Sequence, residues 1–339
     1  MKIIFGVNSF GMGHAMRSAE IIKELSKDNE IEIITGGKSA DYLSKVGKVK
    51  RVNYLSFVIK DGNIKYFQTF LFNLLKSPLI FFNFISLFSR CLAKRPDIII
   101  TDFEPIVSYT GLLLRIPVIS FDNQHIVTDT KIKKIGNIFS VFLYKLTVYL
   151  MVPFPKKKII VTFFNPKIKA NNSILVSPVV REVIRNQEVK SGDYLLIYLR
   201  LEGDSILKSL EKMKIKCFIY GKTNFKSNKY LIVKKFDELQ FAKDMAKSKG
   251  VICNAGMSTL SEAIYLKKPI LCVPLKGQVE QELNAFYLEE KGFGLSAESI
   301  NLKNIKEFMK NINFYRKNLE KEKLSDKENI KKIIKEFNF

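Results

Sequence analysis

The chain contains no tryptophan, only two histidines and only four cysteines among its 339 residues. His14 and His125 alone cannot supply a multi-histidine metal site. The four cysteines form no Cys-x-x-Cys pair, and each stands in an apolar run. This pattern predicts buried free thiols in a reducing compartment, with neither disulfides nor a metal centre.

Signatures of export and of nucleic-acid binding are also missing. The opening residues MKIIFGVN are apolar only briefly, so they predict a first strand and not a signal peptide. No zinc-ligand spacing and no aromatic RNA-binding motif occurs, which makes nucleic acid the weakest partner hypothesis. We therefore expect a cytoplasmic protein.

Lysine is abundant, and the formal net charge is +23. A charge of this size predicts attraction to something anionic, such as a nucleotide, an acidic lipid or nucleic acid. The alternative is a compositional preference in which lysine only solvates the surface. Both interpretations carry equal weight from the sequence.

Two stretches, residues 67–88 and 135–151, are rich in phenylalanine and leucine. Lys76, Pro78 and Lys145 interrupt them, so neither offers the roughly 20 charge-free apolar residues of a spanning helix. One interpretation is a pair of buried helices. The other is a surface patch that contacts an anionic membrane, with lysines at its edges. That second interpretation predicts a peripheral protein on the inner face of the cytoplasmic membrane.

Strand-like apolar runs alternate with helix-like segments along the chain, and a polar, irregular stretch interrupts the series near residues 180–192. Alternating strands and helices predict an α/β fold with parallel sheets covered on both faces. We expect an N-terminal domain (1–180), a linker (181–192), a second domain (193–320) and a C-terminal helix (321–339). The expected strands are 2–7, 31–34, 97–101, 117–121, 194–199, 215–220, 251–253 and 269–273, and the first expected helix is 15–27.

A glycine-rich turn, Gly11-Met-Gly13-His14, follows the first expected strand. Its glycines let backbone N–H groups approach a ligand, and a helix N-terminus favours an anion. The turn is a poor dinucleotide fingerprint, because Met16 replaces the third glycine. The next expected strand ends in Thr-Gly-Gly, with no acidic residue to hold a ribose, which also disfavours NAD.

His14 is a candidate general base, because a neutral imidazole can accept a proton near neutral pH. A packing role is the alternative. Asp102 directly follows the expected strand 97–101. Because neighbouring parallel strands bring their carboxyl ends together, Asp102 can orient the His14 ring. Asp102 can instead be a turn former or helix cap. Asp102-Phe-Glu104 is the nearest approach to Asp-x-Asp, which disfavours a metal-dependent transferase.

The second half contains a similar turn, Asn254-Ala-Gly-Met-Ser-Thr-Leu-Ser-Glu262, after an apolar strand. Gly256 and its small neighbours expose backbone N–H groups at a helix start, which suits a diphosphate. Hydroxyl groups follow, and Glu262 lies a turn later, where a carboxylate can accept hydrogen bonds from ribose. The loop after the next strand carries amides and a carboxylate that suit the hydroxyls of a sugar, at Gln278, Glu280, Gln281 and Asn284.

The segments NAGMSTLSEA and PILCVPLKGQVEQELNA together resemble the donor-binding signature of GT-B nucleotide-sugar glycosyltransferases. They are similar to plant and antibiotic UDP-glycosyltransferases and to the family 28 enzyme of lipid-linked peptidoglycan synthesis. GMGHAMR and TDFEP resemble the amino-terminal half, as in prokaryotic family 28-like transferases with Gly-x-Gly-His-x-x-Arg. The resemblance implies two Rossmann-like, doubly wound domains whose parallel sheets face a central cleft, with the final helix returning to the N-terminal domain.

The resemblance also implies roles for single residues. His14 matches the catalytic base and Asp102 its orienting carboxylate. Glu262 matches the ribose-binding residue. The sugar is expected at Glu280 and Gln281, beside Gln278, and the diphosphate turn is expected at Asn254, Gly256, Ser258 and Thr259.

Three departures from the family pattern concern the nucleotide. Asn254 stands where plant-type enzymes have histidine and the peptidoglycan enzyme has arginine, and the uracil-stacking tryptophan is missing. The loop after Leu199 is poor in glycine. Gly13, Arg17 and Arg200 are candidates for the lost phosphate contact, although each arginine can equally be a surface residue.

The sequence thus predicts a metal-independent, inverting transferase that moves a hexose-type sugar from a nucleotide sugar, most simply a UDP-sugar, to an acceptor hydroxyl. It needs no cofactor beyond this co-substrate. The basic, aromatic-rich surface suggests a lipid-linked acceptor, with a polysaccharide as the alternative. Two rival functions are a sugar-nucleotide 2-epimerase of the same fold and a catalytically idle binding module.

Overall fold

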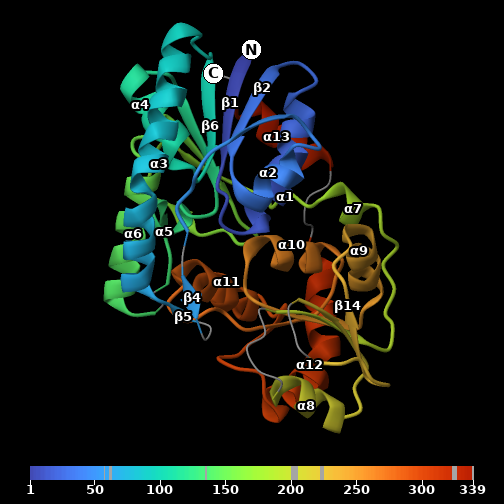
Figure 1. The fold of residues 1–339 in the computed structure, drawn as a ribbon. Helices are drawn as coiled ribbons and strands as arrows, with labels where there is room; N and C mark the ends of the chain where they lie inside the picture. The colour runs from blue at the N-terminus through green and yellow to red at the C-terminus, as the bar shows by residue number, and fades with distance from the viewer. Residues whose placement is uncertain are drawn as a thin grey trace. The chain divides into compact units, whose positions relative to one another are not determined.

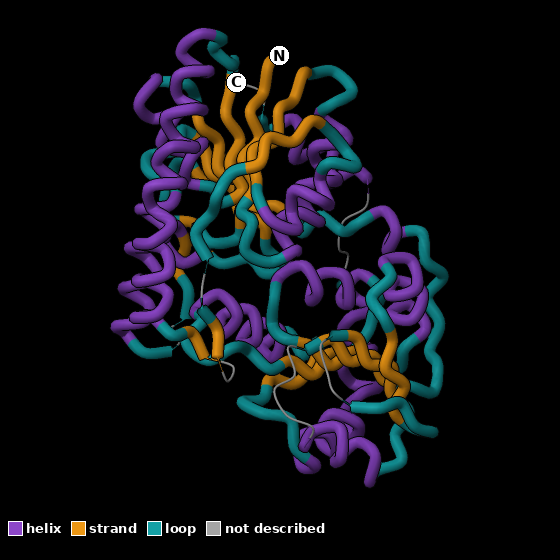
Figure 2. The backbone as a smooth tube through the Cα atoms, viewed as in Figure 1, coloured by secondary structure: helices purple, strands orange, loops and turns teal. Residues whose placement is uncertain are grey.

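The computed structural model describes residues 1–56, 58–60, 63–133, 136–199, 205–221, 225–322 and 327–337. They divide into two compact units. Unit 1 combines Met1–Lys60 and Ile64–Val179 with the last helix, and unit 2 consists of Val180–Ser325 together with Asp61–Asn63. Each unit contains one large parallel sheet flanked by helices (Figures 1 and 2).

The sheet of unit 1 has seven parallel strands in the order β11-β9-β7-β6-β1-β2-β3. The order changes direction between β1 and β6, which is where ligands bind in open α/β sheets. The strands are β1 (Lys2–Val7), β2 (Glu30–Thr35), β3 (Lys48–Arg51), β6 (Ile98–Asp102), β7 (Val118–Asp122), β9 (Lys157–Val161) and β11 (Ser173–Val176). Two-stranded pairs are formed by β4 (Ile59–Lys60) with β5 (Asn63–Ile64) and by β8 (Thr130–Lys131) with β10 (Lys167–Ile168).

Helices cover both faces of this sheet. Alternate residues of β1 belong to different apolar clusters, with Phe5 facing α1 and α13 and Ile4 facing α3 and α4. Gly6 allows α4 to approach closely, because a Cβ there would lie 2.2 Å from a methyl carbon of Val107. The helices are α1 (Met12–Leu25), α2 (Gly37–Leu43), α3 (Tyr66–Ala93), α4 (Pro105–Leu114), α5 (Ile126–Asp129), α6 (Ile138–Met151) and α13 (Lys327–Lys335).

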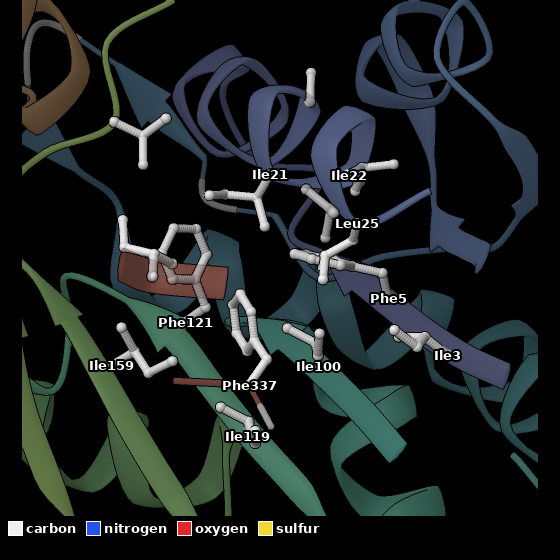
Figure 3. Close-up of a cluster of buried hydrophobic side chains, with 14 of the residues drawn as sticks. Ile3, Phe5, Ile21, Ile22, Leu25, Ile100, Ile119, Phe121, Ile159 and Phe337 are labelled. Atoms are coloured by element: carbon white, nitrogen blue, oxygen red, sulfur yellow. The ribbon is translucent and has the colours of Figure 1, made fainter. Parts of the chain in front are cut away.

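The last helix is part of the core of unit 1. Phe337, which follows α13, packs edge-on against Phe121 of β7 with ring centroids 5.9 Å apart. Figure 3 shows both rings among the isoleucines of β6 and β7. The chain end therefore contributes to the same apolar cluster as the first strand.

Unit 2 repeats the plan with six parallel strands in the order β14-β13-β12-β15-β16-β17. The predicted α/β fold with two Rossmann-like sheets is confirmed. The strands are β12 (Leu195–Tyr198), β13 (Cys217–Tyr220), β14 (Leu231–Lys234), β15 (Gly250–Cys253), β16 (Ile270–Cys272) and β17 (Gly294–Ser296). The helices are α7 (Glu182–Arg185), α8 (Ser205–Lys212), α9 (Glu238–Lys247), α10 (Met257–Tyr265), α11 (Val279–Glu290) and α12 (Leu302–Lys321).

The two aromatic-rich stretches form α3 and α6, and they are not the buried pair that one interpretation predicted. Phe67, Leu75 and Phe82 of α3 are 77%, 73% and 69% exposed. Among the described residues, one helix, Phe67–Ala93, is long and apolar enough to cross a membrane by length and composition, despite Lys76 and Pro78. The sequence analysis had ruled that out on the interruptions alone.

Candidate functional site

Asp102, the last residue of β6, is fully buried. β6 pairs in parallel with β1, with Val7 opposite Asp102, and α1 follows β1 directly. α1 begins at Met12, three residues before the expected helix start, so His14 lies in its first turn. His14 Nδ1 is 2.7 Å from Oδ1 of Asp102. The His14 side chain is 16% exposed. The structure therefore joins the two residues that the sequence paired, with the histidine on the accessible side.

Two more donors hold the Asp102 carboxylate. Arg17 Nε and Ser18 Oγ lie 2.9 and 2.8 Å from its Oδ2, and Arg17 Nη2 bonds its Oδ1. Burial alone would raise the pKa of Asp102, but the charges of Arg17 and His14 outweigh it and lower that pKa to about 2. Asp102 is therefore ionised at neutral pH.

Arg17, which the sequence analysis considered as a donor-phosphate contact, is bonded to Asp102 in the structure. Its side chain is buried, and its guanidinium is bonded to Asp102 and lies 3.0 Å from His14 Nδ1. Arg17 follows His14 by three residues, a spacing that places both on one helix face. That spacing was the signal that the sequence analysis missed. Gly13 lies in the same helix turn and is half-buried.

Glu104 caps α4, and its Oε2 accepts a hydrogen bond from Val107 N at 2.9 Å. Burial raises the pKa of Glu104 to about 7, because two backbone N–H groups offset only part of the desolvation. The residue between the two acids, Phe103, has a left-handed backbone with φ 58°. Asp102 and Glu104 thus have opposite ionisation behaviour only two residues apart.

A second histidine–carboxylate pair ends the neighbouring strand β7. His125 Nδ1 lies 2.7 Å from Oδ2 of Asp122, and Ser120 Oγ also bonds this oxygen. All three side chains are buried, and the sequence analysis did not identify them as a group. Asp122-Asn-Gln-His125 after an apolar strand was the available signal. Its burial distinguishes this pair from His14 and Asp102, because a substrate hydroxyl cannot reach it.

The turn at Gly256 begins α10 in unit 2. Gly256 is the N-cap residue, and a Cβ at this position would meet no atom within 4 Å. Ser258 and Thr259 are half-buried in the first helical turn. Asn254 donates from Nδ2 to the carbonyl of Val273 at 2.9 Å. The exposed start of a helix, with hydroxyl groups beside it, is suited to an anion.

Glu262 lies one turn later, and its carboxylate already has a partner. Arg181 Nη2 donates to Glu262 Oε2 at 2.8 Å, and Arg181 Nε bonds Oε1. Arg181 also donates to Glu238 at 2.7 Å. Burial would lower the pKa of Arg181, but the two carboxylates hold it above its usual range. Glu262 is only 4% exposed, and its carboxylate is already bonded to Arg181. Ribose binding by Glu262 therefore remains a prediction.

The sequence analysis missed Arg181 because it assigned residues 181–192 to a linker. In the structure this stretch belongs to unit 2, and α7 begins within it. An arginine 81 residues from Glu262 gives no local pattern that pairs the two.

The predicted sugar-binding residues lie at the start of α11. Gln281 is buried, and its Oε1 accepts from Leu275 N at 3.0 Å, so it shapes the loop. Gln278 is the N-cap residue and is half-buried, as is Glu280. Asn284 is fully buried and donates to Ala255 O at 3.1 Å, which ties α11 to the Gly256 turn. Arg200 lies outside the described residues.

A model of glycosyl transferase family 1 matches residues 1–313. The chain belongs to this family. An uncharacterized glycosyltransferase of Methanosarcina mazei is 25% identical over 352 residues, covering 87% of this chain and 85% of the relative. The family assignment makes the protein a glycosyltransferase, and its two sheets are those of the GT-B fold.

Solved structures show the same fold. A UDP-glucosyltransferase from Polygonum tinctorium superposes with a TM-score of 0.71 at 14% identity, covering 99% of this chain and 98% of that one. A Medicago truncatula protein complexed with UDP-glucose gives 0.66 at 14% identity, covering 98% and 97%. Both share the fold over nearly their whole length.

Proposed function

We propose that this glycosyltransferase moves a hexose-type sugar from a UDP-sugar to an acceptor hydroxyl with inversion and without a metal ion. The hydrogen bond between His14 and Asp102 carries the proposal. Ionised Asp102 accepts a hydrogen bond from Nδ1–H of His14, which leaves the lone pair on Nε2 to take the proton of an acceptor hydroxyl.

UDP as the carrier is supported by the names of two structural relatives, a UDP-glucosyltransferase and a protein complexed with UDP-glucose. In this chain the backbone N–H groups at Gly256 would meet the charge that develops on the leaving diphosphate. Glu262, oriented by Arg181, would accept hydrogen bonds from ribose, and Glu280 would bind the sugar. A lipid-linked acceptor fits the basic, aromatic-rich surface of unit 1, with a polysaccharide as the alternative.

The test is His14→Ala, followed as release of UDP from a panel of UDP-hexoses in the presence of alcohol acceptors. We expect turnover to fall ~10²- to 10⁴-fold, the usual contribution of a general base. Lys23→Ala, on the exposed side of the same helix, is the matched control and should retain activity.

A second readout separates chemistry from binding. UDP at ~100 times its Kd should stabilise wild type and His14→Ala equally, by about 2.7 kcal/mol. Unchanged turnover in His14→Ala would remove the histidine from the mechanism. Isomerised UDP-hexose formed without any acceptor would replace the transferase by a 2-epimerase.

A further inference from the structure

Exposed apolar side chains are concentrated on two helices of unit 1. Of the 26 large hydrophobic side chains exposed among the described residues, 17 lie on α3 and α6. Both helices pack against α4, and they run along the same flank of unit 1 in Figure 1. We call the exposed side chains of α3 and α6 the α3–α6 surface. An ordinary protein surface has exposed apolar side chains that are scattered singly, whereas here they are gathered on two helices.

The outer face of α3 is apolar with helical periodicity. The exposed residues repeat at intervals of three, four or seven along the helix, at Phe67, Leu71, Leu74, Phe81, Ile85 and Leu92. The opposite side is apolar as well, since Leu87 and Cys91 pack into the core. A helix on a water-exposed flank normally presents a polar outer stripe. The exposed polar side chains of α3, at Gln68, Ser77 and Ser89, do not form one.

α3 lies in the connection between two strands of one sheet. The chain leaves β3 of the seven-stranded sheet, forms the separate β4–β5 pair, enters α3 and then returns to the seven-stranded sheet at β6. Leu87 and Cys91 anchor the C-terminal part of the helix in the core of that unit. A spanning helix would instead have its ends on opposite sides of a bilayer. The α3–α6 surface is therefore suited to lying on an apolar phase and not to crossing it.

The charged residues of the same segments indicate which partner binds the α3–α6 surface. Residues 62–96 contain no Asp or Glu and five Lys or Arg, and residues 130–180 contain no Asp or Glu and nine Lys. Lys76 Nζ lies 4.2 Å from the ring centroid of Phe72, so positive charge is placed among the exposed aromatics. Anionic lipid headgroups attract such lysines. A second copy of the chain would oppose one basic face with another, which disfavours a dimer through this surface.

Phe154 supplies an independent observation. It is 87% exposed and has φ 48°, a left-handed conformation that is unfavourable for a bulky residue. It lies three residues after the end of α6 and stands between two prolines. Lys157 and Lys158 nearby are paired with Glu336 and Asp129, whereas Lys156 is exposed. The backbone thus holds an aromatic ring in water close to an exposed lysine, a combination suited to a membrane interface.

We propose that the α3–α6 surface, with Phe154, docks unit 1 onto an anionic lipid bilayer. α3 lies in the interfacial plane with its outer stripe among the acyl chains, and the surrounding lysines contact the phosphates of the headgroups. The docking does not depend on which sugar is transferred.

The test is flotation of the purified protein with vesicles of phosphatidylcholine alone or mixed with phosphatidylglycerol. Wild type should bind the mixed vesicles, bind phosphatidylcholine at least tenfold more weakly, and be released by high salt. Phe81→Glu should lower the affinity for mixed vesicles roughly tenfold or more, because a fully buried Phe contributes at least that factor. Phe81→Glu/Phe82→Glu should lower it about 100-fold.

Phe314→Glu on α12 of unit 2 is the matched control, because Phe314 is 59% exposed against 63% for Phe81. It changes the net charge equally and should keep the wild-type affinity. UDP-induced stabilisation should be the same in all variants, which shows that they fold. The proposal fails if wild type does not bind mixed vesicles, or if Phe314→Glu weakens binding as much as Phe81→Glu. It also fails if Phe81→Glu only converts a dimer in solution to a monomer, which would identify a second copy as the occupant.

Discussion

Asp102 in unit 1 and Glu262 in unit 2 are two buried carboxylates bonded to an arginine in the same bidentate manner. Asp102 also bonds the partly exposed His14, whereas Arg181, the partner of Glu262, also bonds a second carboxylate, Glu238. The first arrangement includes an imidazole ring that is partly accessible, and the second consists only of fixed ion pairs. In the proposed mechanism, the same kind of ion pair orients the base His14 in one unit and fixes the ribose-binding carboxylate of Glu262 in the other.

The largest expected effect comes from Asp102→Asn, which changes the carboxylate that bonds His14 and Arg17. We expect kcat to fall ~10³-fold or more, because an amide no longer fixes the His14 tautomer or stabilises its protonated form. Arg17 is then left buried without its counter-ion, which should lower the free energy of unfolding by about 3–5 kcal/mol. Steady-state turnover and urea unfolding measure the two effects separately.

The control is Asp122→Asn, which disrupts the buried pair with His125 on the adjacent strand. It should reduce stability but keep turnover within about tenfold of wild type, because His125 is not accessible to an acceptor. Equal losses of turnover in the two variants would mean that strand-end packing, and not orientation of His14, accounts for the effect.

The sequence predicted the parts of this comparison that depend on strand order. The apolar runs at β1, β6 and β7 predicted a parallel sheet, and adjacent strand ends brought Asp102 to His14. It did not predict Arg181, because a contact across 81 residues depends on tertiary packing that leaves no local signature. Nor did it decide the exposure of α3, because apolar composition alone does not tell which side of a helix packs.

A cycle on Arg181 and Glu262 tests whether their pair is structural. Arg181→Met leaves Glu262 buried without a cation and should cost about 3–5 kcal/mol in the free energy of unfolding. Adding Glu262→Gln should recover part of that loss, because the uncompensated charge is removed. Urea unfolding of the four proteins gives the coupling energy.

A comparison of two ligands tests whether Glu262 contacts the ribose. If wild-type Glu262 also binds ribose, UDP should stabilise wild type more than 2′-deoxy-UDP does, and Glu262→Gln should shrink that difference. A difference that survives in Glu262→Gln would assign the ribose contact to another residue.

Glu104 is a further buried carboxylate of unit 1, and it has no arginine or histidine bonded to it among the described contacts. Its pKa in the folded state, about 7, lies above the ordinary value of 4.5. The folded protein therefore holds this proton more tightly than the unfolded chain, so the contribution to stability is complete below pH 4.5 and is lost as pH rises through 7. The loss amounts to about 3 kcal/mol, which follows from 1.36 kcal/mol for each pKa unit.

The test is Glu104→Gln, followed by urea unfolding. Its free energy of unfolding should match that of wild type at pH 5 and exceed it at pH 8. All other ionisable groups are common to the two proteins, so the difference between the two profiles isolates Glu104. Parallel profiles would show that a cation or water reaches Glu104, and that an arginine is not what separates it from Asp102 and Glu262.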